Sequence, residues 1–262
     1  MSAYLLFLAL SAGVGFAVLW AAAKRAALPS RFVWDTWFAS AALAWFGARV
    51  ASGWLQAVAP DATTDLLGQG ISSGGIASIG AIAVFLVAIT GMAHLDRRVA
   101  HRPAEARDCF LPSLAAAEAV ARLGCFSAGC CHGTPAYSLP WAVTFPETSA
   151  CSFAHIPVHP TQLYQSLGCL GLAVLLYGVT GTGHPDRRRV SGLTLYLVGY
   201  GSLRFVVESF RGDLSPSLGG TPVNSCLSLG LVGLGILHAF RHGILPAPGT
   251  PASRPTVRRG AT

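Results

Sequence analysis

The chain has 262 residues, of which 52% are hydrophobic and only 11% are charged. Soluble domains carry about 25% charged residues, so this composition excludes a soluble globular protein of this length. Several windows of roughly 20 apolar residues follow one another, each long enough to cross about 30 Å of hydrocarbon. The composition therefore predicts an all-α integral membrane protein, whose formal net charge of +7 needs an explanation of its own.

Apolar runs in chain order predict seven transmembrane helices. The first run, Tyr4 to Ala23, has no basic residue before it and is followed by Lys24 and Arg25, which favours a retained helix over a cleaved secretory signal. The spans are expected at residues 3–23, 36–57, 70–93, 109–127, 161–181, 191–210 and 222–240. Together they form one transmembrane domain, residues 1–243. The Pro-, Ala-, Gly- and Arg-rich segment 244–262 is predicted to be a disordered cytoplasmic tail.

The basic residues are distributed unevenly between the loops that join these spans. Of the 18 lysines and arginines, 14 fall on one side, in the loops after spans one, three and five and in the tail. The positive-inside rule makes that side cytoplasmic, so the N-terminus is expected outside and the C-terminus inside. Basic loops that face anionic inner-leaflet lipid also explain the net positive charge, and no nucleic-acid partner is expected.

The longest loop, about residues 128–160, joins spans four and five on the outer side. It holds Gly, Pro and aromatic residues such as Tyr137 and Trp141, and Glu147 is its only Asp, Glu, Lys or Arg residue. Loops of this length are often functional. Its apolar character favours a position in the interface between membrane and water.

Five ionisable residues fall inside predicted spans, where such groups are costly and mark candidate functional sites. Arg49 lies in span two, Glu118 and Arg122 lie in span four, and Arg204 and Glu208 lie in span six. The last four form two pairs with a spacing of four residues, so a carboxylate can offset a guanidinium on one helix face. Ion pairing within each helix is the alternative explanation of both pairs.

Depth favours a shared site for the two paired arginines. Arg122 and Arg204 each lie 13 residues beyond the start of their span, about 20 Å from the cytoplasmic edge. HPTQLY, residues 159–164, enters span five from the outer side, and GQGISSGGIASIG, residues 68–80, enters span three there too. These elements can converge on one cavity, where two guanidiniums suit the phosphate of an outer-leaflet lipid.

The stretch ARLGCFSAGCCHG holds three of the seven cysteines. Three interpretations stay open for it. It could form a metal site of Cys125, Cys130 and His132, or a disulfide from Cys130 or Cys131 to Cys151 on the oxidising outer side. It could also be a turn of small residues at a helix end.

Several motifs together resemble the signature segments of the prolipoprotein diacylglyceryl transferase family. ARLGCFSAGCCHG, HPTQLYQ and GYGSLRFVVESFR are similar to its main segments, and DTWFASAALAWFGARV and GGIASIGA to two weaker ones. The order matches over roughly residues 10–212. The resemblance implies seven spans in a bacterial cytoplasmic (inner) membrane and transfer of diacylglyceryl from phosphatidylglycerol to a lipobox cysteine thiol. The acceptor would be a prolipoprotein signal peptide, glycerol phosphate would be released, and no cofactor or metal is expected.

The resemblance also implies roles for individual residues of this chain. It implies catalytic roles for Arg122, Arg204, Glu208 and His159. It implies substrate-binding roles for a second set: Arg49, Asp108, Cys125, Gly133, Gln162, Tyr164 and Tyr200. The two catalytic arginines would hold the lipid phosphate and stabilise charge that develops on it as the glyceryl carbon–oxygen bond breaks, with Glu208 orienting Arg204.

The chain departs from the family pattern at three positions. Cys125 replaces an asparagine, Cys130 replaces a glutamate often found before the closing glycine, and Ile79 replaces a histidine proposed as the base for the thiol. Another group, such as His132 or His159, would then activate the thiol. Three alternatives follow: a paralogous lipid transferase with a different acceptor, a thiol redox membrane protein that uses the adjacent cysteines, and a lipid-binding protein without chemistry.

Overall fold

The computed structural model of the protein describes residues 2–58, 74–180, 191–212, 217–218 and 221–242. These ranges are mostly helical. The helices are α1 (Ser2–Arg25), α2 (Ser30–Val58), α3 (Gly74–Leu95), α4 (Pro103–Asp108), α5 (Leu111–Ala128), α6 (Thr161–Val179), α7 (Gly192–Glu208) and α8 (Val223–Arg241). The strands are β1 (Val143–Thr144), β2 (Pro157–Val158), β3 (Ser217–Leu218) and β4 (Thr221–Pro222).

Each predicted span overlaps one of the long helices. The short helix α4 was not predicted from the sequence. Four helical segments in the described ranges are long and apolar enough to cross a membrane: Ala3–Arg25, Pro103–Ala128, Thr161–Val179 and Val223–Arg241. Gly80–Leu95 is a shorter apolar helix. The architecture therefore agrees with an all-α membrane protein, apart from four two-residue strands.

Two prolines explain the short helix that sequence patterning missed. Pro103 starts α4 and Pro112 lies in the first turn of α5. Proline lacks a backbone N–H and is tolerated in the first turn of a helix, so each proline favours a new start. The result is a short helix at one end of the bundle, before α5 enters the core.

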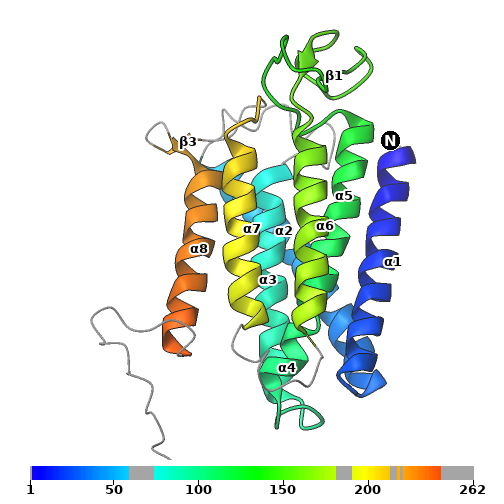
Figure 1. Ribbon diagram of the computed structural model, residues 1–262, viewed down its shortest axis with the longest axis vertical. Coiled ribbons are helices and arrows are strands. Elements are labelled where there is room, and N and C mark those ends of the chain that lie inside the picture. Colours follow the sequence, from blue (N-terminus) through cyan, green and yellow to red (C-terminus); the bar gives the residue numbers. More distant parts are fainter. Residues whose placement is uncertain (1, 59–73, 181–190, 213–216, 219–220, 243–262) are drawn as a thin grey trace, which may run out of the picture.

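The helices form a layered bundle in which α5 lies between α1 and α6 (Figure 1). Beyond α6, α7 packs against α6 and α8 packs against α7, while α2 and α3 form a pair. One continuous hydrophobic core joins α1, α2, α3, α5, α6 and α7, with Leu19, Ile89, Phe110 and Tyr196 among its fully buried side chains. Large apolar side chains also face outward, as a lipid environment permits.

The two ends of the bundle differ in composition. At one end, here called the α4 end, α1 terminates in Lys24 and Arg25, and Arg98 pairs with Asp96 and Asp35 at 2.7 and 2.8 Å. The N-terminus lies at the opposite end, beside the segment that contains β1 (Figure 1). We call this second end the loop end.

Residues 129–160 fold over the loop end. Strand β1 pairs with β2 in antiparallel register, with Val143 opposite Val158. Val158 of β2 and Phe145, which follows β1, belong to a small hydrophobic cluster that is separate from the main core. Tyr137 and Trp141 are exposed on the outside of this segment.

Backbone hydrogen bonds join this segment to the neighbouring helices. The N–H groups of Gly133 and Thr134 donate to the carbonyl oxygens of His159 and Phe210, each at 2.9 Å. The N–H of Gly212 donates to the carbonyl of His132 at 3.1 Å. The start of the loop, the residues before α6 and the end of α7 are therefore held together at the loop end.

Candidate functional site

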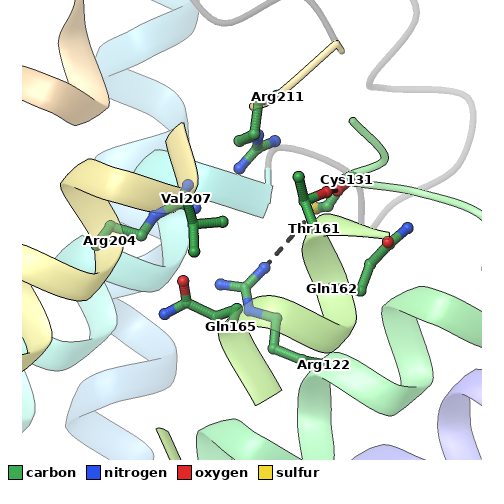
Figure 2. A pocket seen from close by; sticks show the side chains of 8 residues that line it. All are labelled: Arg122, Cys131, Thr161, Gln162, Gln165, Arg204, Val207 and Arg211. Atoms are coloured by element: carbon green, nitrogen blue, oxygen red, sulfur yellow. Dashed lines mark hydrogen bonds between the residues drawn. The ribbon is translucent and has the colours of Figure 1, made fainter. Parts of the chain in front are cut away.

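Side chains from α5, α6, α7 and the segments that flank them line a small cavity near the loop end (Figure 2). Its walls carry three guanidiniums, two primary amides, one hydroxyl and one thiol. The lining residues are Arg122, Cys131, Thr161, Gln162, Gln165, Arg204, Val207 and Arg211. Arg122 and Arg204, which the sequence predicted to converge, thus line the same cavity.

Arg122 reaches the cavity from α5 with its guanidinium buried. Its Nε and Nη2 donate to Oε1 of Glu118 at 2.8 and 2.6 Å, so the predicted pair forms along one helix face. Its Nη1 points to Cys131 Sγ at 3.8 Å, the contact drawn as a dashed line in Figure 2. Glu118 thus offsets the charge of Arg122 and fixes the orientation of its guanidinium, one edge of which faces the cavity.

Arg204 enters from α7 and is only 1% exposed. Its Nη2 lies 3.0 Å from Oε2 of Glu208, as the four-residue spacing predicted. Its Nε has no hydrogen-bond partner among the described residues. A buried guanidinium donor is costly to leave unsatisfied, so this atom marks a place for an acceptor from outside the chain.

Glu208 is shared between several groups. Arg211 Nη1 lies 3.7 Å from Oε2 of Glu208, and the side-chain amide of Asn224 in α8 donates to Oε1 at 3.1 Å. A single carboxylate thus stands against two arginines of the cavity wall. Arg204 and Arg211 thus both bring guanidiniums to this side of the cavity, and guanidiniums suit an anionic ligand.

Helix α6 supplies the amide groups. Gln162 donates from Nε2 to the carbonyl of Cys130 at 2.8 Å, and Gln165 donates to Cys169 Sγ at 3.6 Å. The Oε1 atoms of both glutamines are buried and accept no hydrogen bond within the described part of the chain. Guanidinium donors together with amide oxygens that can accept hydrogen bonds match a ligand that combines a phosphate with hydroxyl groups.

His159 and Tyr164 lie at the rim and do not line the cavity. His159 Nδ1 is 3.3 Å from Tyr164 Oη, which also accepts a hydrogen bond from Trp141 Nε1 at 2.9 Å. The His159 ring lies against Phe210 with a centroid distance of 5.2 Å. The rim therefore joins α6, the end of α7 and the outer segment through aromatic contacts.

Tyr200 and Gly133 flank the site without entering its lining. Tyr200 is fully buried and stacks on Tyr196 with ring centroids 5.5 Å apart. A Cβ on Gly133 would lie 2.6 Å from the His159 carbonyl oxygen and 2.8 Å from that of Phe210. Only glycine leaves room for this approach of two backbones.

Two predicted substrate-binding residues lie away from the cavity. Arg49 is exposed on α2, with its guanidinium over the Trp45 ring at 5.4 Å. Asp108 lies at the α4 end, where it pairs with Arg107 at 2.6 Å and accepts the Gly192 N–H at 2.9 Å. The glycine-rich segment 68–80 begins in residues outside the described ranges, and the side chain of Ile79 is likewise outside what the structure describes.

Other lining residues were not assigned from sequence, namely Thr161, Gln165, Val207 and Arg211. Helical spacing could have identified two of them from the sequence. Gln165 follows Gln162 by three residues, and Arg211 follows Glu208 by three residues, so each continues a face already marked by a polar residue.

The cysteine-rich turn contains a compact group of thiols. The Sγ atoms of Cys125, Cys130 and Cys131 all lie within 4.8 Å of one another. Cys130 and Cys131 are both thiols, so neither forms the disulfide to Cys151 that was one of the open interpretations. His132 is 1% exposed, accepts the Ser152 N–H at Nε2, and contacts the Gly133 carbonyl through Nδ1. Its nitrogens are thus occupied, contrary to the metal interpretation that included it.

Comparison with known proteins gives one consistent result. A family model described as "Prolipoprotein diacylglyceryl transferase" matches residues 1–241. A protein of Clostridium tetani named phosphatidylglycerol–prolipoprotein diacylglyceryl transferase is 36% identical over 49% of the chain and 50% of its own length. A relative of the same name from Azoarcus sp. is 37% identical over 52% of the chain and 51% of its length. One from Streptomyces coelicolor, named with the suffix 1, is 32% identical over 73% of the chain and 52% of its length. The chain thus spans about half the length of these relatives.

Proposed function

The chain belongs to the prolipoprotein diacylglyceryl transferase family, and we propose that it transfers diacylglyceryl from phosphatidylglycerol to a lipobox cysteine thiol of a prolipoprotein signal peptide. The relatives that it matches carry this activity in their names. The observation that carries the proposal is the cavity lined by Arg122, Arg204 and Arg211 together with two glutamines whose amide oxygens accept no hydrogen bond within the described residues.

The lining of the cavity supports a headgroup site, because guanidinium and amide groups suit a phosphate and hydroxyl groups. The glycerol phosphate part of the lipid would bind there, with the acyl chains left along the outer surface of the helices. The buried Nε of Arg204 would donate to a phosphate oxygen, and the Oε1 atoms of Gln162 and Gln165 would accept from the glycerol hydroxyls.

The reaction assigns one role to each group. The acceptor thiolate sulfur attacks the glyceryl carbon that carries the phosphate, a carbon–sulfur bond forms, and the carbon–oxygen bond to the phosphate breaks. Glycerol phosphate leaves with the bonding electron pair. Arg122 and Arg204 stabilise the charge that develops on the leaving phosphate, and Glu208 orients Arg204. His159 at the rim takes the thiol proton, with Tyr164 orienting its ring.

The proposal includes seven crossings of a bacterial cytoplasmic (inner) membrane, with the N-terminus outside and the C-terminus in the cytoplasm. Supporting it, the N-terminus and the 129–160 segment share the loop end, and basic side chains gather at the α4 end. On this arrangement the cavity lies toward the outer leaflet, where the exposed Tyr137 and Trp141 suit the interface. Residues 1–243 form the transferase domain, and the predicted tail 244–262 lies outside the described residues.

The decisive experiment measures glycerol phosphate released from phosphatidylglycerol by the purified full chain, with and without a lipobox peptide. The expected result is release that depends on the peptide, with a peptide mass gain equal to one diacylglyceryl group. Arg122→Ala should abolish both signals. Arg97→Ala, a change to an exposed arginine at the α4 end, is the matched control and should leave them unchanged.

The same assay separates the alternatives. Release with the lipid alone, or with another thiol and not with the peptide, would assign a different acceptor. Lipid binding without release would indicate a binding protein. Full activity of Arg122→Ala would refute the proposed role of the cavity.

A further inference from the structure

Three sulfur atoms gather beside the cavity, which one of their residues, Cys131, also lines, and none of them takes part in the bond-making or bond-breaking steps of the proposed transfer. The Sγ atoms of Cys125, Cys130 and Cys131 lie within 4.8 Å of one another, and the described ranges contain no second group of three potential ligands so placed. All three are thiols. We propose that they form a binding site for a thiophilic metal ion, Cu(I), held by three thiolates. This proposal is independent of the proposed function.

The fold brings the sulfurs together by reversing the chain at the end of α5. Gly129 adopts φ 76°, the left-handed conformation that glycine favours at a helix C-terminus. The reversal returns Cys130 over the last turn of α5, where its Sγ lies 3.7 Å from the Cys125 carbonyl oxygen. Cys131 follows with φ 61°, a rare conformation for a residue with a side chain.

Two side chains from α6 hold this turn in place. Thr161 Oγ1 donates to the Cys131 carbonyl at 2.6 Å, and Gln162 Nε2 donates to the Cys130 carbonyl at 2.8 Å. Both donors are almost completely buried. The turn is therefore fixed from outside, so the three thiols are positioned before any ligand arrives.

The spacing of the sulfurs fits a single ion. A metal–sulfur bond of about 2.3 Å places three sulfurs around one ion about 4 Å apart. The observed separations, all within 4.8 Å, require a contraction of at most about 1 Å. Rotation about the Cα–Cβ bonds can supply such a change without moving the fixed backbone.

The number of ligands favours Cu(I) over zinc. Structural zinc sites almost always have four protein ligands. The adjacent histidine is the natural fourth candidate, but His132 Nε2 accepts the Ser152 N–H at 3.1 Å. Its Nδ1 then carries the proton and donates to the Gly133 carbonyl at 3.1 Å. Thiolates select soft ions such as Cu(I), for which three sulfurs complete a trigonal site.

The arginines around the turn favour the Cu(I)-bound state. Binding converts three Cys–SH groups and one Cu(I) into a Cu(I) tris-thiolate with charge −2 and releases three protons. Arg122 Nη1 lies 3.8 Å from Cys131 Sγ, and Arg211 lines the same cavity. Nearby guanidiniums favour the thiolate form of cysteine and offset the new negative charge.

The test is a titration of the reduced full chain, kept anaerobic in detergent, with Cu(I) buffered by a chromophoric chelator. The expected result is one tightly bound Cu(I) per chain. X-ray absorption of the loaded wild-type protein should show three sulfur neighbours at about 2.3 Å and no nitrogen neighbour. This spectrum needs no variant, so it remains informative if a cysteine variant fails to fold.

Variants locate the ion. Cys125→Ser, Cys130→Ser and Cys131→Ser should each weaken Cu(I) binding at least tenfold, while Cys226→Ser, a change to an exposed cysteine of α8, should leave it unchanged. Loss of binding in Cys226→Ser, retention in the triple serine variant, or no Cu(I) held against the chelator would overturn the proposal. Preference for Zn²⁺ with loss in His132→Gln would replace it with a four-ligand site.

Discussion

The two ends of the bundle use the same kinds of charged residue in opposite ways. At the α4 end, Asp108 pairs with Arg107 and also accepts the Gly192 N–H, so the carboxylate joins α4 to the start of α7. At the loop end, Arg204 pairs with Glu208 but keeps a buried Nε without an acceptor in the described chain. The comparison teaches that a buried ion pair alone does not mark a binding site. Unused hydrogen-bonding capacity that faces a cavity does.

The largest expected effect comes from removing an arginine at the loop end. Arg204→Ala should lower kcat/KM for phosphatidylglycerol by roughly 10²–10³-fold, because one donor to the developing charge is lost. Glycerol phosphate release is the measurement. Activity within threefold of wild type, in protein that elutes as wild type does, would break the distinction between the two ends.

A smaller loss of activity is expected when Glu208, the partner of Arg204, is replaced by the uncharged glutamine of similar shape. Glu208→Gln replaces charge-assisted contacts to Arg204 and Arg211 with neutral ones, a difference of about 1–1.5 kcal/mol. Activity should fall about tenfold. Comparison with Glu208→Ala provides the control, since the alanine variant should lose clearly more activity if orientation of Arg204 is the role.

At the α4 end the matching change should act on stability and not on catalysis. Asp108→Asn weakens the contact to Arg107, at a cost of about 1 kcal/mol in the free energy of unfolding. Thermal unfolding in detergent should show the lower midpoint, while turnover per folded molecule stays at the wild-type value. A tenfold fall in turnover would instead return Asp108 to the substrate-binding set that the sequence motifs suggested.

The smallest effect is expected from the exposed pair of Asp96 and Arg98, which lies in the segment that joins α3 to α4. The side-chain hydrogen bond from Arg98 lowers the pKa of Asp96 below its ordinary value of 3.8. A depressed carboxyl pKa stabilises the fold above about pH 4, and this contribution is lost as the pH falls through the folded-state pKa. Asp96→Asn should therefore shift the unfolding midpoint slightly at pH 7, and the shift should diminish as the pH is lowered below about 4. The shift should be smaller than that of Asp108→Asn, since exposed pairs contribute little.

Hydropathy and charge predicted the helical segments well because apolar runs of membrane length have few alternative structures in lipid. The meeting of Arg122 and Arg204 followed from equal depth along two helices that enter from the same side. Pairing within each helix followed from the four-residue spacing. These features depend on helix geometry alone, which a sequence specifies locally.

Features that depend on chain reversal or on contacts between helices were harder to predict. The thiol group needs the left-handed turn at Gly129, and the engagement of His132 needs the distant Ser152. Motif likeness placed Arg49 in the substrate-binding set, whereas its exposed position on α2 is a property of packing that a motif does not contain.

The backbone bonds at the loop end have a dynamic consequence. Gly133, Thr134 and Gly212 each donate to a carbonyl of another segment, and the three bonds join the same short stretches of chain, so we expect them to open together. Their hydrogen exchange should then occur in a single shared opening, slower than that of the exposed Tyr137 amide region. These joined segments would behave as one cooperative unit, and a lipid headgroup bound in the neighbouring cavity would slow exchange at all three amides together.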